Sequence, residues 1–223
     1  MMGIFGRMFR RPNFHKMRKE KDVEGLIEIF QNPNRSTNED SKVRNTLVDI
    51  VHDSVREKDL ETIRKIYRSA KTHEIRFAHV NAIKVLGELK DKGAVELLID
   101  EIRNPLFSLS SNAAAIALSK IGDKRAIKPL IEVFSKKYYE HVRRHPKSFD
   151  PMVSLVTNIT YSEGKEIRRD EPSLYDAAET ALCAFNQKAI ESLVEARRRA
   201  EKSGDVSMST YINSIFRKVQ KER

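Results

Sequence analysis

The chain has 223 residues, of which 39% are hydrophobic and 33% are charged, with no Trp, 8 Gly and 7 Pro. This composition is typical of a helix-rich protein and argues against a β-sandwich, whose turns need frequent Gly and Pro. The chain has a single cysteine, Cys183, so an internal disulfide is excluded. It contains no run of about 18 apolar residues, the length that a membrane-spanning helix needs. We therefore expect a cytoplasmic, all-α protein.

The formal net charge of +10 is concentrated at the two ends of the chain. Residues 1–22 hold 7 Lys and Arg against 2 Asp and Glu, and residues 197–223 hold 8 against 3, so each end carries +5 and the middle is neutral. Basic ends of this kind either keep a protein soluble or contact phosphate groups. A short basic, apolar helix at the N-terminus could also touch a membrane surface weakly.

Apolar residues spaced by three and four predict a series of amphipathic helices along the chain. Outside the two central copies described next, we expect them in chain order at residues 22–30, 40–56, 59–67, 75–89, 107–121, 172–186, 188–196 and 205–221. One row of apolar residues recurs on every second helix of the series and predicts a continuous core: Leu26, Ile63, Leu98, Leu130 and Leu193. The layout is a basic N-terminal segment or cap (1–21), a repeat array (22–204), and a closing helix with a basic tail (205–223).

Two stretches 32 residues apart are nearly the same. Residues 86–102 read LGELKDKGAVELLIDEI, and residues 118–134 read LSKIGDKRAIKPLIEVF. Each predicts two helices joined at an Asp-Lys turn, where the aspartate is suited to cap the second helix by accepting from free backbone N–H groups. A single helix pair cannot bury its apolar stripe, so the pairs must stack.

The motif LxxIGDxRAIxPLIxxF resembles the HEAT-like repeat named after phycobilisome lyases, and the repeat covers most of residues 22–200. The resemblance implies an α-α superhelix of about five helix pairs, with first helices on the convex side and second helices lining the concave side. It also implies use as a binding scaffold, although some members of the family are enzymes.

One segment, residues 138–171, is much longer than a link between repeats. Loops longer than about 12–15 residues are often functional. Asp150-Pro151 favours a short helix over 151–160; the alternative is a hairpin in which SLVTNITY pairs with KEIRR. Four arginines in or near this insertion are possible phosphate contacts: Arg143, Arg144, Arg168 and Arg169.

The outward positions of the second helices form two acidic rows. Positions 24, 61, 96, 128 and 191 read Glu, Glu, Glu, Lys, Glu, and positions 28, 65, 100, 132 and 195 read Glu, Lys, Asp, Glu, Glu. Each row nets −3 and would repel phosphate, which favours a basic protein partner on the concave side. The candidate partner-binding residues are Glu61, Lys65, Glu96, Asp100, Lys128, Glu132, Glu191 and Glu195.

No catalytic or metal-binding pattern emerges from the sequence. His141 and His145 have a spacing that metals accept, but Pro146 follows directly and no third ligand is near. The single His73-Glu74 dipeptide lacks the recurrence that deoxyhypusine hydroxylases, built from the same repeat, use to bind iron. HEAT-like alkylpurine DNA glycosylases need a stacking surface in a basic groove, whereas this chain has no Trp and acidic rows. We expect Cys183 to be a small core residue on a packed helix rather than a nucleophile. We expect no enzyme, no metal and no cofactor.

The favoured function is a non-catalytic scaffold that binds a protein across its concave face. The alternative is a nucleic-acid-associated protein that uses its basic ends and the insertion, and a weaker one is an auxiliary subunit of a modifying enzyme, as the lyase resemblance implies. If the protein is a scaffold, removal of residues 1–21 and 203–223 should leave it able to bind its partner. If it binds phosphate groups through its basic ends, the same removal should abolish binding.

Overall fold

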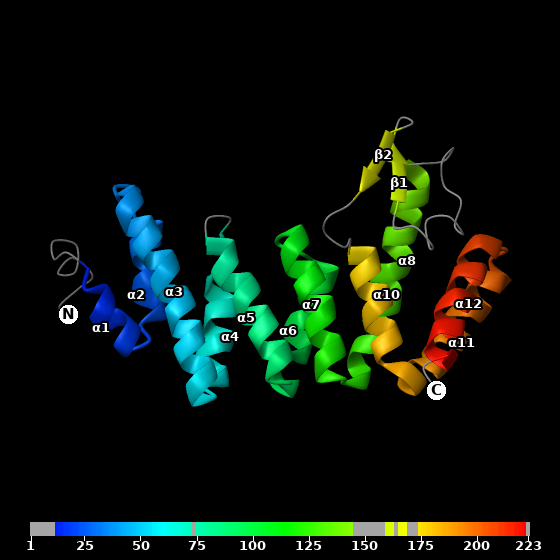
Figure 1. Cartoon of the computed structure of the whole chain (residues 1–223), viewed down its shortest axis with the longest axis horizontal. Coiled ribbons are helices and arrows are strands. Elements are labelled where there is room, and N and C mark those ends of the chain that lie inside the picture. The colour runs from blue at the N-terminus through cyan, green and yellow to red at the C-terminus, as the bar shows by residue number, and fades with distance from the viewer. Residues whose placement is uncertain (1–11, 73–74, 145–158, 163–164, 169–173, 222–223) are drawn as a thin grey trace. The chain divides into compact units, whose positions relative to one another are not determined.

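The computed structural model describes residues 12–72, 75–144, 159–162, 165–168 and 174–221 (Figure 1). The described residues form helices and a single small hairpin, which confirms the all-α, HEAT-like helical repeat class. The chain divides into two compact units, Met1–Ala82 and Ile83–Arg223, here called the N-terminal and C-terminal units. None of the described helices combines the length and the hydropathy needed to cross a bilayer.

The N-terminal unit consists of α1 (Phe14–Lys19), α2 (Val23–Gln31), α3 (Thr37–Glu57), α4 (Leu60–Ser69) and the start of α5 (Arg76–Glu88). Aspartates begin two of these helices, because Asp22 accepts from the Gly25 N–H at 3.0 Å and Asp59 from the Thr62 N–H at 3.1 Å. The core is formed by apolar side chains on the facing stripes of these helices, among them Leu26, Phe30, Leu47, Ile50, Ile63 and Ile66.

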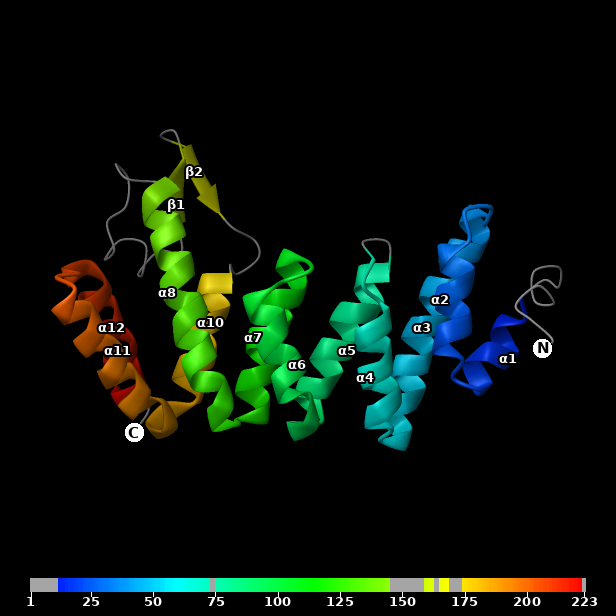
Figure 2. The same ribbon diagram turned by 180° about the vertical axis from the view of Figure 1, so that it is seen from behind.

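The C-terminal unit contains the helix pairs α5–α6, α7–α8 and α10–α11 and the closing helix α12 (Figures 1 and 2). Its elements after α5 are the 3-10 turn η3 (Lys92–Ala94), α6 (Val95–Arg103), α7 (Ser108–Ile121), the 3-10 turn η4 (Lys124–Ala126), α8 (Ile127–Arg144), β1 (Ile159–Ser162), β2 (Lys165–Arg168), α10 (Leu174–Ala184), the 3-10 turn η5 (Asn186–Ala189), α11 (Ile190–Lys202) and α12 (Val206–Lys221). Helix α7 packs against α6 and α10, and α8 packs against α6, α10 and α11. The layers therefore stack in sequence order, as a repeat requires.

The aspartates of the two Asp-Lys turns act as caps, as predicted, but each caps a 3-10 turn that precedes the α-helix. Asp91 accepts from the Gly93 N–H at 2.9 Å, and Asp123 accepts from the Arg125 N–H at 3.0 Å. Each aspartate thus caps a single 3-10 turn, which leads directly into the α-helix that follows. The predicted core row is confirmed, since all five of its leucine and isoleucine side chains are at most 1% exposed.

Helices α5 and α7 approach each other unusually closely at Gly87. A Cβ atom at this position would lie 2.6 Å from the Cα atom of Ala117, a distance that real side chains do not tolerate. Glycine is therefore required here by the packing of two helices rather than by backbone conformation.

The insertion differs from the favoured expectation. Ile159 pairs with Arg168 and Ser162 pairs with Lys165 in an antiparallel hairpin, so the hairpin alternative is confirmed for these residues. The helix predicted over 151–160 is wrong at its end, because the β-branched and aromatic side chains of Ile159–Ser162 favour a strand; residues 151–158 lie outside the described residues. Helix α8 also continues to Arg144, into the segment 138–171 that was predicted as an insertion between repeats.

The closing helix α12 is an integral part of the C-terminal unit. It packs against α10 and α11 and buries Met208, Tyr211, Ile212, Ile215 and Val219. Removal of residues 203–223 would expose the apolar surface that these side chains cover. We therefore expect removal of residues 203–223 to destabilise the C-terminal unit, contrary to the expectation from the sequence.

Candidate protein-binding face of the second helices

The second helices of the C-terminal unit, α6, α8 and α11, carry a stripe of exposed charged side chains that we call the second-helix face. Spacings of three and four residues place these side chains on one side of each helix. The face comprises Glu96, Asp100 and Arg103 on α6, Lys128, Glu132 and Lys136 on α8, and Glu191, Glu195, Arg198 and Lys202 on α11, all of them exposed.

Ion pairs connect neighbouring helices across this face. The Arg125 Nη1 lies 2.9 Å from the Glu96 Oε1, and the Arg103 Nη2 lies 2.9 Å from the Glu132 Oε2. Both pairs join residues 29 positions apart, three fewer than the 32-residue repeat. Each of the two α6 side chains, Glu96 and Arg103, therefore meets a residue about one helical turn before its own repeat equivalent.

The first helices pair differently. Lys120 of α7 bonds to Glu88 of α5, and these residues are 32 positions apart, the full repeat. Side chains at equivalent positions thus face each other on the first helices, whereas on the second helices the contacts run diagonally. The diagonal contacts bring opposite charges together on the second-helix face.

On α11 an ion pair lies within the helix. The Glu195 carboxylate accepts a hydrogen bond from the Arg199 guanidinium at 2.5 Å, and that bond, with the positive charges of Arg199 and Lys128, lowers the pKa of Glu195. Helix α11 packs against α8.

In the N-terminal unit, the equivalent carboxylates are also paired. Lys65 of α4 bonds to Glu24 of α2, and this hydrogen bond lowers the pKa of Glu24. Glu61 accepts from Arg64 at 3.0 Å and from Arg68 at 3.1 Å, which lowers the pKa of Glu61. These side chains are exposed, so each pair contributes little stability.

The two predicted rows, each of which nets −3, do not form an unbroken acidic surface. Five of their eight carboxylates have ion-pair partners, namely Glu24, Glu61, Glu96, Glu132 and Glu195. The next row along the same helices is basic. It consists of Gln31, Arg68, Arg103, Ser135 and Arg198. The face has mixed charge, and the expectation of a basic partner loses its basis.

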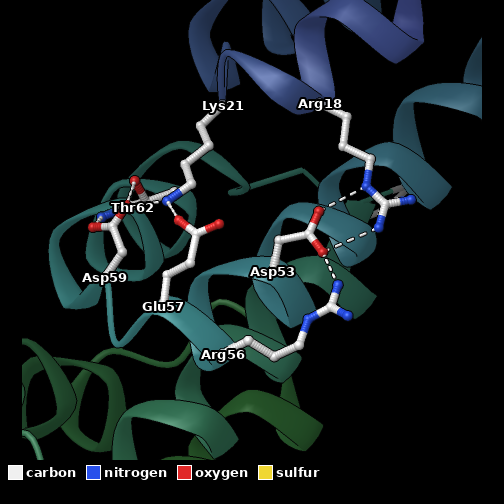
Figure 3. Close-up of polar contacts among 7 residues, drawn as sticks. All are labelled: Arg18, Lys21, Asp53, Arg56, Glu57, Asp59 and Thr62. Atoms are coloured by element: carbon white, nitrogen blue, oxygen red, sulfur yellow. Dashed lines mark hydrogen bonds and ion pairs between the residues drawn. The ribbon is translucent and has the colours of Figure 1, made fainter.

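A second polar cluster fastens α1 to the N-terminal unit (Figure 3). The Arg18 Nε donates to the Asp53 Oδ2 at 2.7 Å, and the Lys21 Nζ donates to Glu57 and Asp59 at 2.6 and 2.5 Å. The hydrogen bond from Arg18 lowers the pKa of Asp53 to about 2, and the hydrogen bond from Lys21 lowers that of Asp59 to about 2.

This cluster, which we call the α1 clamp, assigns a structural role to part of the basic N-terminal segment. Helix α1 contains no fully buried residue, so the charged contacts of Arg18 and Lys21 hold it against α3 and the start of α4. From the sequence, the cations of this segment were expected to be solvated or to contact phosphate groups. Their carboxylate partners lie 31 to 38 residues away, a distance at which no local pattern reveals a contact.

The possible phosphate contacts lie at the edge of the described structure. Arg143 and Arg144 end α8, and Arg168 ends β2. Arg169 lies outside the described residues, as do His145 and the His73-Glu74 pair, while His141 belongs to the last turn of α8. Cys183 is half-buried on α10. Within the described ranges, no three His, Cys, Asp or Glu side chains come together in a group able to hold a metal ion.

Comparison with known families agrees with the repeat architecture. Residues 78–145, which run from α5 into the insertion after α8, match the family model for HEAT repeats. No curated protein matches the chain. The matched segment contains the two central copies of the motif and the Arg103–Glu132 and Arg125–Glu96 contacts. Residues 78–145 are thus similar to HEAT repeats, and the described helices have the fold of a HEAT-like helical repeat.

Proposed function

We propose that this protein is a non-catalytic scaffold that binds a protein partner across its second helices. The observation that carries the proposal is the match of residues 78–145 to HEAT repeats, which commonly present the second helices as a protein-binding surface. The exposed stripes of α6 and α8 lie side by side there and are braced by the Arg103–Glu132 pair. A surface held in place before binding loses less conformational entropy on association.

We further propose that the repeat is of the phycobilisome-lyase type and that the protein acts in the cytoplasm without a cofactor. In this proposal the insertion shapes or gates the binding surface. The residues that contact the partner include Lys65, which pairs with Glu24, and the exposed Lys128.

A nucleic-acid-associated function is the second candidate. It is favoured by the two arginines that end α8, Arg143 and Arg144, and by Arg168 at the end of β2. It is disfavoured by the α1 clamp, because Arg18 and Lys21 are already engaged by carboxylates. A phosphate strand would have to compete with these contacts.

Affinity capture of the tagged full chain from its own cell lysate, with and without nuclease, tests the proposal. We expect a stoichiometric protein partner that survives nuclease treatment. The variant Asp100→Arg/Glu191→Arg should reduce its recovery, since both carboxylates are exposed and neither has an ion pair within the described part of the chain. The pair Ile116→Arg/Thr210→Arg adds the same side chains at exposed positions off the face and should leave recovery unchanged.

Loss of the partner on nuclease treatment would overturn the proposal in favour of nucleic acid. Equal recovery with both double variants would place the binding surface elsewhere on the molecule.

A further inference from the structure

Helix α1 is attached to the N-terminal unit in a different way from the helix that closes the C-terminal unit. Helix α12 buries five hydrophobic side chains, whereas α1 buries none, and its apolar residues Phe14 and Met17 are only half-buried. A helix of 6 residues does not persist alone in water, since about 12–15 residues are needed even for good helix formers. Helix α1 therefore depends on its contacts with the rest of the unit.

These contacts are mainly the charged contacts of the α1 clamp. The Arg18 guanidinium donates to Asp49 at 2.8 Å and to Asp53 at 2.7 and 3.1 Å. The Lys21 Nζ donates to two further carboxylates at 2.6 and 2.5 Å (Figure 3). We call the four acceptors the clamp carboxylates: Asp49, Asp53, Glu57 and Asp59. The paired side chains are partly exposed, so the contacts contribute little stability and weaken further in salt.

Without α1, the clamp carboxylates form an acidic surface. Three of them are spaced by four residues along α3 and therefore lie on one side of that helix, where like charges repel. Residues 49–59 hold four carboxylates and two cations, Arg56 and Lys58, so the stretch has a net charge of −2. The two charges of Arg18 and Lys21 balance this excess.

The two helices that pack beside α3 in the same unit do not supply these cations. The charged residues of α2 are both acidic, Glu24 and Glu28. The three cations of α4 bond to other carboxylates, because Arg64 and Arg68 contact Glu61 and the lysine of this helix contacts Glu24. Among the contacts described for this unit, α1 is thus the source of the positive charge that faces the clamp carboxylates from another helix.

We propose that α1 is a detachable strap that covers a docking site for a basic segment of a protein partner. Lysines and arginines of the partner would replace Arg18 and Lys21 on the clamp carboxylates. The segment of this chain that already lies there identifies the occupant, as does the charge of −2 that it leaves uncovered. The site lies on α3 and at the start of α4, so the inference does not depend on the second-helix face.

The strap and the partner would compete for one site. A segment that binds only when α1 is detached has an apparent affinity reduced by the fraction of molecules in which α1 is attached. Weak attachment of α1 keeps this reduction small, which a cap with a buried apolar face would not do. A nucleic-acid strand does not fit the uncovered surface, because the clamp carboxylates would repel its phosphates.

Two measurements on the full chain test the inference with a labelled deca-lysine peptide as the probe. Fluorescence anisotropy compares the strap variant Arg18→Gln/Lys21→Gln with the matched control Lys16→Gln/Lys19→Gln, which removes the same charge from exposed positions of the same helix outside the clamp. A third variant adds Asp49→Asn/Asp53→Asn to the strap variant. Circular dichroism checks that all variants keep the helical content of the wild type.

Hydrogen–deuterium exchange of the wild type, with and without saturating deca-lysine, follows the peptide that covers residues 14–19. Deca-glutamate at the same concentration is the control probe.

We expect the strap variant to bind deca-lysine about tenfold more tightly than the control, because two exposed cations no longer compete for the carboxylates, and the third variant to lose this gain. Deca-lysine, but not deca-glutamate, should speed exchange at residues 14–19 of the wild type about fivefold. Equal binding by the strap variant and the control would overturn the inference, because binding would then reflect net charge alone. A gain that survives in the third variant, or exchange at residues 14–19 that bound deca-lysine leaves unchanged, would also overturn it.

Discussion

At the scale of single residues, the C-terminal unit contains a buried carboxylate, that of Glu101. Glu101 is 3% exposed, and it accepts hydrogen bonds from the Leu106 N–H at 3.2 Å and from the Ser110 hydroxyl at 2.5 Å. It thereby holds the link between α6 and α7 at the start of α7. A buried acidic side chain is retained only where its hydrogen bonds are satisfied.

Replacement of Glu101 separates its charge from its hydrogen-bonding role. Glu101→Leu leaves the Leu106 N–H and the Ser110 hydroxyl without this acceptor and should lower the free energy of unfolding by about 2–4 kcal/mol. Glu101→Gln keeps an acceptor oxygen and should cost about 1 kcal/mol. Urea denaturation followed by circular dichroism measures both. Equal losses for the two variants would show that the carboxylate does not act through these bonds.

At the scale of elements, the α1 clamp makes the N-terminal unit sensitive to acid. Asp53 has a pKa of about 2 in the folded chain, below the value of about 3.9 expected for an unfolded one. Protonation therefore favours the unfolded state: the stabilisation is complete above about pH 4 and is lost as the pH falls through about 2. Partial exposure of the Arg18 and Asp53 side chains keeps this stabilisation small.

The variant Asp53→Asn isolates this contribution. At pH 7 it should be less stable than the wild type, and the difference should shrink as the pH is lowered from 4 to 2. Thermal denaturation at several pH values measures the difference, with Asp100→Asn as a control at a carboxylate that has no ion pair among the described residues. A difference that does not vary with pH would show that the contact with Arg18 does not lower the pKa of Asp53.

The elements themselves were accessible from sequence, because a helix that buries one stripe must repeat apolar residues every three or four positions. Leu26, Leu98 and Leu193 illustrate this: each was placed in one core row, and each is buried. The order and limits of most helices follow from the same signal. The hairpin at Ile159–Ser162 was harder, since a short apolar run satisfies a helix and a strand equally well.

The arrangement of charges could not be predicted in the same way. Periodicity indicates which side chains face outward, but it does not indicate how far one helix is displaced along its neighbour. Arg125 meets Glu96, although its repeat equivalent is Gly93, and this offset turned a predicted acidic face into one of mixed charge. The α1 clamp was missed for a related reason, because its partners lie on another helix.

At the scale of the whole molecule, we propose that a partner protein contacts the second helices. The layered helices are similar to HEAT repeats over residues 78–145, and ion pairs hold exposed side chains of α6, α8 and α11 in place. The first helices, α5, α7 and α10, then serve to support that surface.

Hydrogen–deuterium exchange on the captured complex tests this claim most directly. The account predicts that the partner slows exchange in peptides covering residues 95–103, 127–136 and 190–202, and leaves peptides from α5, α7 and α10 unchanged. Protection confined to the first helices, or to the chain ends, would contradict it.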